Sequence, residues 1–320
     1  MNKKKFKRVL VVLGGTSGER AVSLDSGKAC IKALKNKKYS VKTLDPKFKN
    51  LNLINKNNTD VVFNALHGKD GEDGVAQSYF EYLRIPYTHS GVLSSYNAMN
   101  KMISKEIFKN NKILTPKYLT IEKKIYSKNK LIKLLIKKKI KFPVVIKPLN
   151  EGSSLGVKIL KNIRALDKAA RSLYKEYNQL MFEQFINGQE VQVAVLNNKT
   201  IGAIELIPKR LFYDYKAKYT KKAKTRHVMP ARLTPRKYKE VLNLAGRAHR
   251  ALKCRGVTRS DFKFYKNKFY LLELNTQPGM TKLSLAPEIA NYCGINFSNF
   301  VEKILLDASI NKWKRDFLSP

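Results

Sequence analysis

Three oxygen-bearing side chains in the last third of the chain could hold a metal ion. Glu273 and Asn275 are two residues apart in the apolar run "LLELN", so their side chains leave one face of a strand. The preceding segment "TRSDFKFY" is joined to that strand by a short link. A three-residue hairpin loop, or an equivalent bulge, would place Asp261 opposite Glu273, whereas a two-residue loop would place it opposite Leu272. Two carboxylates and an amide suit Mg²⁺, which completes its shell with water and phosphate oxygens. Arg259 would share this face; the alternative is a solvent-facing polar stripe.

A second group of residues could bind phosphate. In "FPVVIKPLNEGSSLGV", Lys147 ends a β-branched strand and precedes a loop that contains glycines and Ser154. Glycine lets backbone N–H groups approach an anion closely, and lysine supplies a point charge. The order differs from the Walker A motif, because here the lysine comes before the glycines. The alternative is an ordinary flexible hairpin.

The segment "MFEQFINGQE" is suited to a nucleoside. Glu183 ends a strand and Glu190 follows after a short turn. A segment of this shape can present backbone groups to an adenine edge and a carboxylate to ribose hydroxyls. Taken alone, this pattern is a weak indication of nucleotide binding.

The elements that must position these residues alternate along the chain. Strands and helices alternate over residues 1–95, which predicts a parallel α/β sheet. Residues 96–186 read as a mixed α+β unit. The remainder, 187–320, reads as antiparallel strands, a polar loop at 209–230, a helix at 235–252, the hairpin and two final helices. These ranges are the three predicted domains.

Composition restricts the function classes further. The 320 residues are 43% hydrophobic, with no apolar run long enough to span a membrane. The short apolar stretch 9–13 runs into a glycine turn and reads as a strand instead of a signal peptide. Cys30, Cys254 and Cys293 have no ligand spacing, which suggests neither disulfides nor zinc and favours the cytoplasm.

The net charge of +40 raises the alternative of a basic, non-enzymatic nucleic-acid-binding protein. Only 14 of the 64 basic residues are arginine, although arginine is favoured for base readout. The lysines are also spread along the whole chain beside abundant Asn and Ile. This pattern favours compositional drift over a specific nucleic-acid partner.

Nine segments follow one another along the chain: "GGTSGERAVS", "LHGKDGEDGVAQ", "IPYTHSGV", "MNK", "VVIKPLNEGSSLGV", "EQFINGQE", "FYDYKAKYT", "TRSDF" and "LELNTQPGMTKLSL". In order and spacing they resemble the D-alanine–D-alanine ligases of the ATP-grasp superfamily. The resemblance covers roughly residues 6–306. It implies a three-domain ATP-grasp fold with ATP held between the central and C-terminal domains. It also implies a cytoplasmic enzyme that joins two D-alanine molecules through an acyl phosphate for peptidoglycan precursors.

The resemblance assigns a nucleotide and metal site residue by residue. Lysines would contact the phosphates, a strand end would border the adenine, and a glutamate would hold the ribose. Two Mg²⁺ ions, with Mn²⁺ as a substitute, would bind Asp261, Glu273 and Asn275. The nucleotide residues implied are Lys101, Lys147, Ser154, Glu183, Gln184, Ile186 and Glu190.

The substrate residues are assigned in the same way. Glu19 would face the ammonium of the first D-alanine, and His67 its carboxylate, although His67 could instead cap a turn. Ser284 and the Leu285 N–H would hold the second carboxylate at a helix N-terminus. The remaining assignments are Arg259 and the Gly279 N–H for the oxyanion, Tyr219 and Ser153 for closing the site, and Lys218 for the transferred phosphate.

Departures from the family pattern are few: this chain has Asn100 where Asp is usual, His89 where Gly is usual and Lys216 where Glu is usual. Rivals within the superfamily are ligases that make D-alanyl-D-lactate or D-alanyl-D-serine, or another carboxylate–amine ligase. The lactate-forming relatives replace the lid tyrosine, typically by histidine, so Tyr219 favours an amine as second substrate. A homodimer is expected only from the resemblance.

Overall fold

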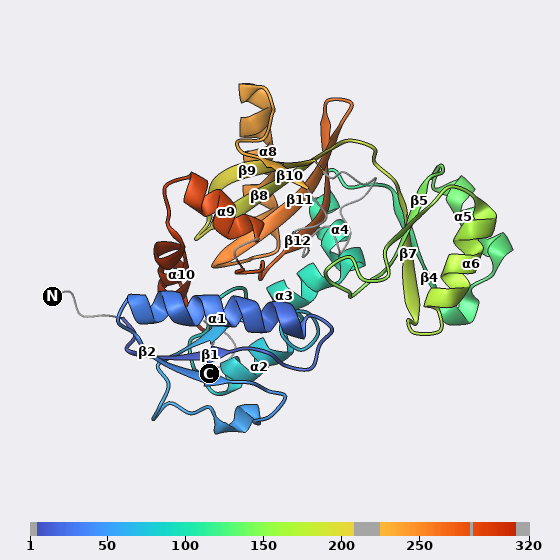
Figure 1. The fold of residues 1–320 in the computed structure, drawn as a ribbon. Helices are drawn as coiled ribbons and strands as arrows, with labels where there is room; N and C mark the ends of the chain where they lie inside the picture. The colour runs from blue at the N-terminus through green and yellow to red at the C-terminus, as the bar shows by residue number, and fades with distance from the viewer. Residues whose placement is uncertain (1–4, 208–224, 282–283, 312–320) are drawn as a thin grey trace, which may run out of the picture.

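The computed structural model describes residues 5–207, 225–281 and 284–311 (Figure 1). In its N-terminal part, strands β1 (Arg8–Val12), β2 (Ser40–Leu44) and β3 (Val61–Asn64) form a parallel sheet of order β2-β1-β3. This confirms the predicted parallel α/β arrangement. Helices α1 (Arg20–Asn36) and α2 (Val75–Tyr82) accompany the sheet, as does a 3₁₀ turn at Leu51–Leu53.

Helix α1 packs closely on the N-terminal sheet through one face. Its buried residues recur every three or four positions and include Cys30 and Leu34. Gly27 belongs to this face, and a Cβ there would fall 2.7 Å from the side chain of Leu13. This contact holds the middle of α1 against Leu13, just after β1. The Ser23 hydroxyl accepts the Gly14 N–H at 2.7 Å and holds the first turn of α1, and therefore the adjacent Glu19, at the same place.

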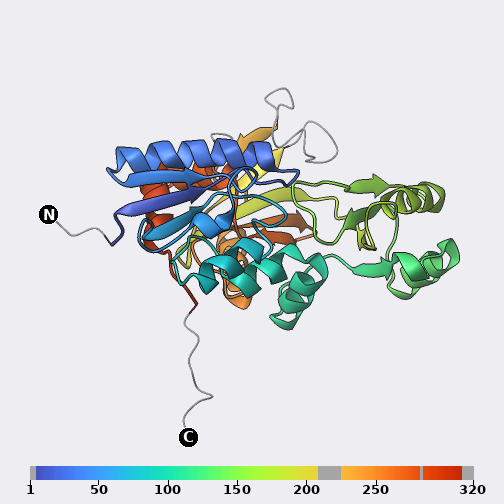
Figure 2. The ribbon, with the colours of Figure 1, turned by 90° about the horizontal axis from the view of Figure 1, so that it is seen from below.

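The middle of the chain forms a separate antiparallel sheet of order β4-β7-β5-β6. Its core contains Leu131, Leu166 and Phe182, so helices α5 and α6 cover one face of the sheet. Seen from below, this part projects from one side of the molecule (Figure 2). Its elements are β4 (Tyr118–Glu122), a 3₁₀ turn at Lys123–Ile125, α5 (Lys128–Lys137), β5 (Val144–Pro148), β6 (Lys158–Leu160), α6 (Ile163–Leu173) and β7 (Gln179–Gln184).

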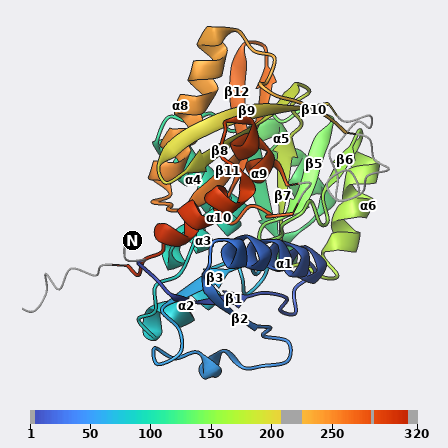
Figure 3. The same ribbon diagram turned by 60° about the vertical axis from the view of Figure 1, so that its left-hand side comes forward.

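The C-terminal part is a five-stranded antiparallel sheet of order β10-β9-β8-β11-β12. Alternate residues of β8 face opposite cores: Val193 packs with α8, and Ala194 with α9 and α10. Figure 3 shows α9 and α10 between this sheet and α1. The bounds are β8 (Gln189–Leu196), β9 (Lys199–Ile207), β10 (Arg226–Val228), α8 (Pro235–Ala251), β11 (Val257–Tyr265), β12 (Lys268–Asn275), α9 (Leu285–Tyr292) and α10 (Phe297–Leu306).

Two elements differ from the sequence-based expectation. The predicted polar loop at 209–230 was wrong at its end, because residues 226–228 form β10, which adds to the edge of the sheet beside β9. Helix α3 (Val92–Met99) was not predicted; it leads directly into α4 (Lys101–Asn110). The Asn100 side chain caps α4 by accepting the N–H groups of Met102 and Ile103, each at 3.1 Å.

The hydrophobic cores do not follow the predicted domain boundaries closely. Phe108 of α4 shares a core with Phe262 and Leu271 of the C-terminal sheet. Helix α4 is therefore anchored to that sheet, although it lies in the segment 96–186. The domain boundaries stay a prediction. Within the described residues, no helix combines the length and hydrophobicity needed to cross a membrane.

Candidate active site

The β11–β12 hairpin brings the predicted metal ligands together. Asp261 lies opposite Glu273, and Arg259 lies opposite Asn275. The turn itself has two residues, Lys266 and Asn267, both with positive φ, as in a type I′ turn. A bulge between Asp261 and the next residue shifts the register, which confirms the alternative in which a bulge replaces the third loop residue.

Arg259 holds Asp261 in place. Its Nε and Nη2 donate to the two carboxylate oxygens at 2.8 and 3.0 Å, a bidentate ion pair that is largely buried. Asn275 turns its Oδ1 to the backbone N–H of Gln277 at 2.8 Å. Nowhere in residues 5–207, 225–281 and 284–311 do three His, Cys, Asp or Glu side chains form a ready-made metal cage. Two carboxylates and one amide nevertheless fit an ion that takes its other ligands from phosphate and water.

Toward its turn, the hairpin borders a cavity that we call the lysine pocket, through Asp261, Lys263 and Glu273. It encloses about 770 Å³ including its open mouth, and the central and C-terminal sheets both contribute to its wall. Apolar residues line one part of it and charged residues the other. The lining residues are Lys101, Val145, Lys147, Glu151, Ser154, Val157, Glu183, Gln184, Phe185, Ile186, Glu190, Asp261, Lys263, Leu272 and Glu273.

All seven residues that the sequence assigned to the nucleotide line the lysine pocket. Glu190 pairs with Lys263 at 2.9 Å. The Gln184 side chain is tied to the backbone of Lys141, accepting its N–H at 2.7 Å and donating to its carbonyl at 3.0 Å. The pocket therefore combines an apolar wall, suited to a flat ring, with charged groups that suit phosphates and hydroxyls.

Glu183 is the most deeply buried acid of the lysine pocket, and its carboxylate faces two ammonium groups. Lys147 Nζ lies 2.8 Å from Oε1, and Lys105 Nζ lies 2.6 Å from Oε2. Burial opposes ionisation of Glu183, but the two lysines outweigh it and lower the pKa of the carboxyl. Burial lowers the pKa of Lys105 to about 8, although Glu183 counteracts the shift.

Sequence reasoning missed Lys105. The available signal was its position four residues after Lys101 on α4, where it shares the buried face with Phe108. A lysine on the core side of an amphipathic helix requires a buried partner. The partner, Glu183, lies on β7 of the central sheet, whereas α4 packs on the C-terminal sheet. Only the tertiary structure therefore reveals the pair.

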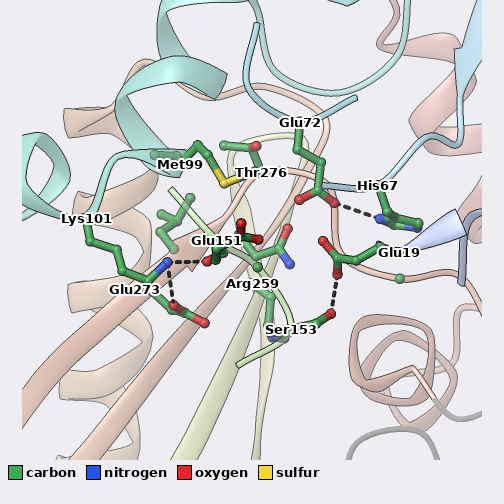
Figure 4. Close-up of a pocket in the computed structure, with 15 residues that line it drawn as sticks. Glu19, His67, Glu72, Met99, Lys101, Glu151, Ser153, Arg259, Glu273 and Thr276 are labelled. Carbon is green, nitrogen blue, oxygen red and sulfur yellow. Dashed lines mark hydrogen bonds and ion pairs between the residues drawn. The ribbon is translucent and has the colours of Figure 1, made fainter. Parts of the chain in front are cut away.

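At the end away from its turn, the hairpin borders the acidic pocket, about 670 Å³ including its open mouth (Figure 4). Glu19, Glu72 and Glu151 converge on it from three separate segments. Its lining residues are Glu19, His67, Glu72, Ala98, Met99, Lys101, Glu151, Gly152, Ser153, Arg259, Glu273, Leu274, Asn275, Thr276 and Gly279. Burial raises the pKa of Glu151, with Lys101 acting in the opposite sense. An ammonium group would be attracted to this arrangement.

Glu19 is enclosed by two glycines from different segments. A Cβ on Gly68 or Gly152 would fall 2.7 or 2.6 Å from Glu19 Oε2, so neither position has room for a side chain. Ser153 Oγ donates a hydrogen bond to Glu19 Oε1. The glycine-rich loop that was expected at phosphates thus also contacts the carboxylate of the acidic pocket.

His67 joins a turn to helix α1. Its Nδ1 lies 2.7 Å from Glu72 Oε1, and its Nε2 lies 3.2 Å from Ser26 Oγ, which also accepts the Met280 N–H at 3.1 Å. Burial opposes the charged ring, yet Glu72 raises the pKa of His67 above its ordinary value; burial raises the pKa of Glu72 as well. His67 both braces the turn and lines the pocket, and Glu72 is a second residue that sequence reasoning missed.

Lys101, Glu151 and Glu273 line both pockets. Lys101 Nζ donates to the Glu151 carbonyl and lies 3.8 Å from Glu273 Oε2 (Figure 4). The two cavities therefore meet at two glutamates and one lysine.

Gly279 lines the acidic pocket next to the start of α9. A Cβ on Gly279 would fall 2.8 Å from Ser284 Oγ, and Ser284 is the residue immediately before the helix, which begins at Leu285. The Ser284 hydroxyl accepts the Thr281 N–H at 3.0 Å. Lys218 and Tyr219 lie outside the described residues, as does Lys216.

Known proteins are similar to this chain in sequence and in fold. Residues 44–90 match the family described as "D-ala D-ala ligase N-terminus", and residues 107–306 match "D-ala D-ala ligase C-terminus". A D-alanine–D-alanine ligase of Pelagibacter ubique (strain HTCC1062) is 53% identical over 96% of this chain and 99% of the relative. One from Geotalea uraniireducens (strain Rf4) is 42% identical over 96% and 97%.

Solved structures agree with the sequence comparison. The D-alanine–D-alanine ligase of Bacillus anthracis superposes with a TM-score of 0.83 at 33% identity, covering 94% of this chain and 97% of that one. The same enzyme complexed with ATP gives a TM-score of 0.81 at 30% identity, with the same coverage. With both family segments matched in order and relatives covered almost end to end, the chain belongs to the D-alanine–D-alanine ligase family.

Proposed function

We propose that this protein is an ATP-dependent ligase that joins two D-alanine molecules into D-alanyl-D-alanine for peptidoglycan precursors. The observation that carries the proposal is the meeting of two unlike cavities at Glu273 and Lys101. A lysine pocket suited to a nucleotide adjoins an acidic pocket suited to an amino acid. A phosphoryl group at the junction can therefore pass from one to the other.

In the first step, the carboxylate of one D-alanine attacks the γ-phosphorus of ATP, and ADP leaves. The product is an acyl phosphate. Phosphoryl transfer depends mainly on positioning and on neutralising charge at the phosphate oxygens. Lys101 and Lys147 would contribute positive charge there, and Glu19 would orient the amino acid through its ammonium group.

Asp261, Glu273 and Asn275 would hold Mg²⁺ at the junction. When bound, the ions would neutralise part of the triphosphate charge. Arg259 would keep the Asp261 carboxylate in the orientation in which it meets Glu273 across the hairpin.

In the second step, the amine of the other D-alanine attacks the acyl carbon, and inorganic phosphate leaves through a tetrahedral intermediate. The developing oxyanion would receive hydrogen bonds from Arg259 and the Gly279 N–H. One such donor typically contributes about 3 kcal/mol to the transition state. Ser284 and the Leu285 N–H would hold the second carboxylate at the start of α9.

The sequence assignments outside the described residues remain part of the proposal. Tyr219 would complete the closure of the site together with Ser153, and Lys218 would reach the transferred phosphate. A homodimer in the cytoplasm with no nucleic-acid partner is the expected context.

Phosphate release tests the function directly. Purified protein should release phosphate only when ATP, Mg²⁺ and D-alanine are all present, and the product should be D-alanyl-D-alanine. When D-lactate is added beside D-alanine, the unmodified protein should still form D-alanyl-D-alanine and no lactate ester, whereas Tyr219→His should shift the product toward the lactate ester. Absence of phosphate release, together with DNA binding that survives high salt and Glu273→Ala, would favour the nucleic-acid alternative instead.

A further inference from the structure

Lys105 is a buried cation for which the reaction described above has no use. Its side chain is fully buried, and it lines neither pocket in the part of the chain that the structure describes. Its ammonium lies 2.6 Å from Glu183 Oε2 and 5.6 Å from the centre of the Tyr118 ring. Ordering and desolvating a lysine here is costly, so the charge requires an explanation.

The charge balance of the lysine pocket provides one. Among the described residues that line it, three are lysines and five are carboxylates. Each lysine has a carboxylate nearby: Lys147 has Glu183, Lys263 has Glu190, and Lys101 has Glu273. An entering triphosphate would therefore meet cations whose charge is already offset.

Glu183 differs from the other carboxylates of the pocket because two lysines share it. Its two oxygens are divided between the two lysines, with Oε1 on Lys147 and Oε2 on Lys105. With Lys105 present, the cluster of two ammonium groups and one carboxylate carries a net charge of +1. Without Lys105, Lys147 and Glu183 would cancel. Only Lys147 of the two lysines faces the pocket, so the excess charge acts there.

We propose that Lys105 is a positioning residue for the nucleotide's triphosphate, which offsets the Glu183 charge from behind and leaves the Lys147 ammonium able to bind phosphate. The inference rests on the proposed ATP site. It adds that phosphate affinity depends on a residue that touches no phosphate. Burial is the main cause of the lowered pKa of Lys105; Glu183 opposes the shift, and the nearby Lys147 ammonium adds to it.

The test compares nucleotides that differ in phosphate number. Titration calorimetry would measure binding of ATP with Mg²⁺, and of AMP, to Lys105→Met. ATP affinity should fall roughly tenfold, as expected for losing one charge near a polyanion, while AMP affinity should change little. The matched control is Lys109→Met on the same helix. It removes the same charge from a side chain that is 73% exposed, and it should leave both affinities unchanged.

A second substitution separates charge balance from damaged packing. In Lys105→Met/Glu183→Gln, Lys147 again carries an unopposed charge, so the ratio of ATP to AMP affinity should return toward that of the unmodified protein. Glu183→Gln alone should keep or raise that ratio, and it serves if Lys105→Met does not fold. Equal losses for ATP and AMP in Lys105→Met, an unchanged ATP affinity, or a fall of the ratio in Glu183→Gln would overturn the inference.

The inference and the proposed function fail differently. If the unmodified protein bound no ATP, the proposed function would be wrong. If it bound ATP and released phosphate normally, but Lys105→Met bound ATP equally well, only the role of Lys105 would be wrong.

Discussion

The acidic pocket and the lysine pocket are built in different ways. The acidic pocket takes its key groups from loops and chain segments between elements: Glu19 before α1, His67 after β3, and Ser153 in a glycine loop. The lysine pocket takes Lys147 and Glu183 from paired strands. The difference indicates that the amino-acid site depends on several segments meeting, whereas Lys147 and Glu183 keep their relative positions through one sheet.

The largest expected effect is at Glu273, one of the three residues that line both pockets. Glu273→Gln should reduce kcat by about 10²–10³-fold, because it removes charge where phosphate, metal and Lys101 meet. Phosphate release with saturating ATP and D-alanine measures this. The far-ultraviolet circular dichroism spectrum should be unchanged, since the side chain is 34% exposed. Near-normal turnover would show that the junction is not the reaction centre.

A substitution confined to the acidic pocket should affect the amino acid alone. Glu19→Gln should raise the KM for D-alanine by about 30-fold, because it removes the charge that faces the ammonium group. The affinity for ATP should stay the same, since Glu19 does not line the lysine pocket. An equal loss in ATP affinity would contradict the separation of the two pockets.

The matching substitution in the lysine pocket should weaken the binding of ATP and not that of D-alanine. Lys147→Met should weaken ATP binding by about tenfold, the typical contribution of one charge-assisted hydrogen bond, and leave the KM for D-alanine nearly unchanged. Calorimetry with ATP and steady-state kinetics with D-alanine distinguish the two effects. If D-alanine binding weakened as much, strand β5 would be supporting both pockets.

The smallest expected effect concerns stability against pH, and its sign differs between the pockets. His67 has a raised folded pKa, so its stabilising contribution is complete below 6.5 and is lost as pH rises through the folded value. The pKa of Glu72 is raised above 4.5, so Glu72 also makes the free energy of unfolding fall as pH rises. Glu183 has a lowered pKa, so its contribution is present above 4.5 and is lost as pH falls through the folded value.

Urea unfolding between pH 5.5 and 8.5 tests this sign. The unfolding midpoint of His67→Gln/Glu72→Gln should depend less on pH over this interval than that of the unmodified protein. The pKa of Glu183 lies below this interval, so Glu183 does not contribute to the pH dependence measured there. A steeper dependence in the double variant would contradict the assignment of the pH effect to this pair.

Much of the site could be predicted from local sequence patterns. The period of two along β12 places Glu273 and Asn275 on one face, and the neighbouring Leu271 and Leu274 hold the strand in the core. The glycines in "NEGSSLGV" indicate a close backbone approach, which the structure shows at Glu19. Such features depend on neighbours in the chain.

The remainder depended on tertiary contacts. Lys105 and Glu183 are on a helix and a strand from different cores, and Glu72 becomes a partner only when its turn folds back onto His67. Strand β10 was missed because a three-residue edge strand with Arg226 and His227 has no apolar pattern of its own. Its hydrogen-bonding partner, β9, makes it a strand.

The anchoring of α4 has a consequence for how the nucleotide affinity could change over evolution. Lys101 belongs to a helix that Phe108 fastens to the C-terminal core, while Lys147 belongs to the central sheet with its own core. The distance between the Lys101 and Lys147 ammonium groups therefore depends on how the C-terminal core and the central core pack against each other. Conservative changes at Phe108, which lines neither pocket, should therefore change the affinity for ATP.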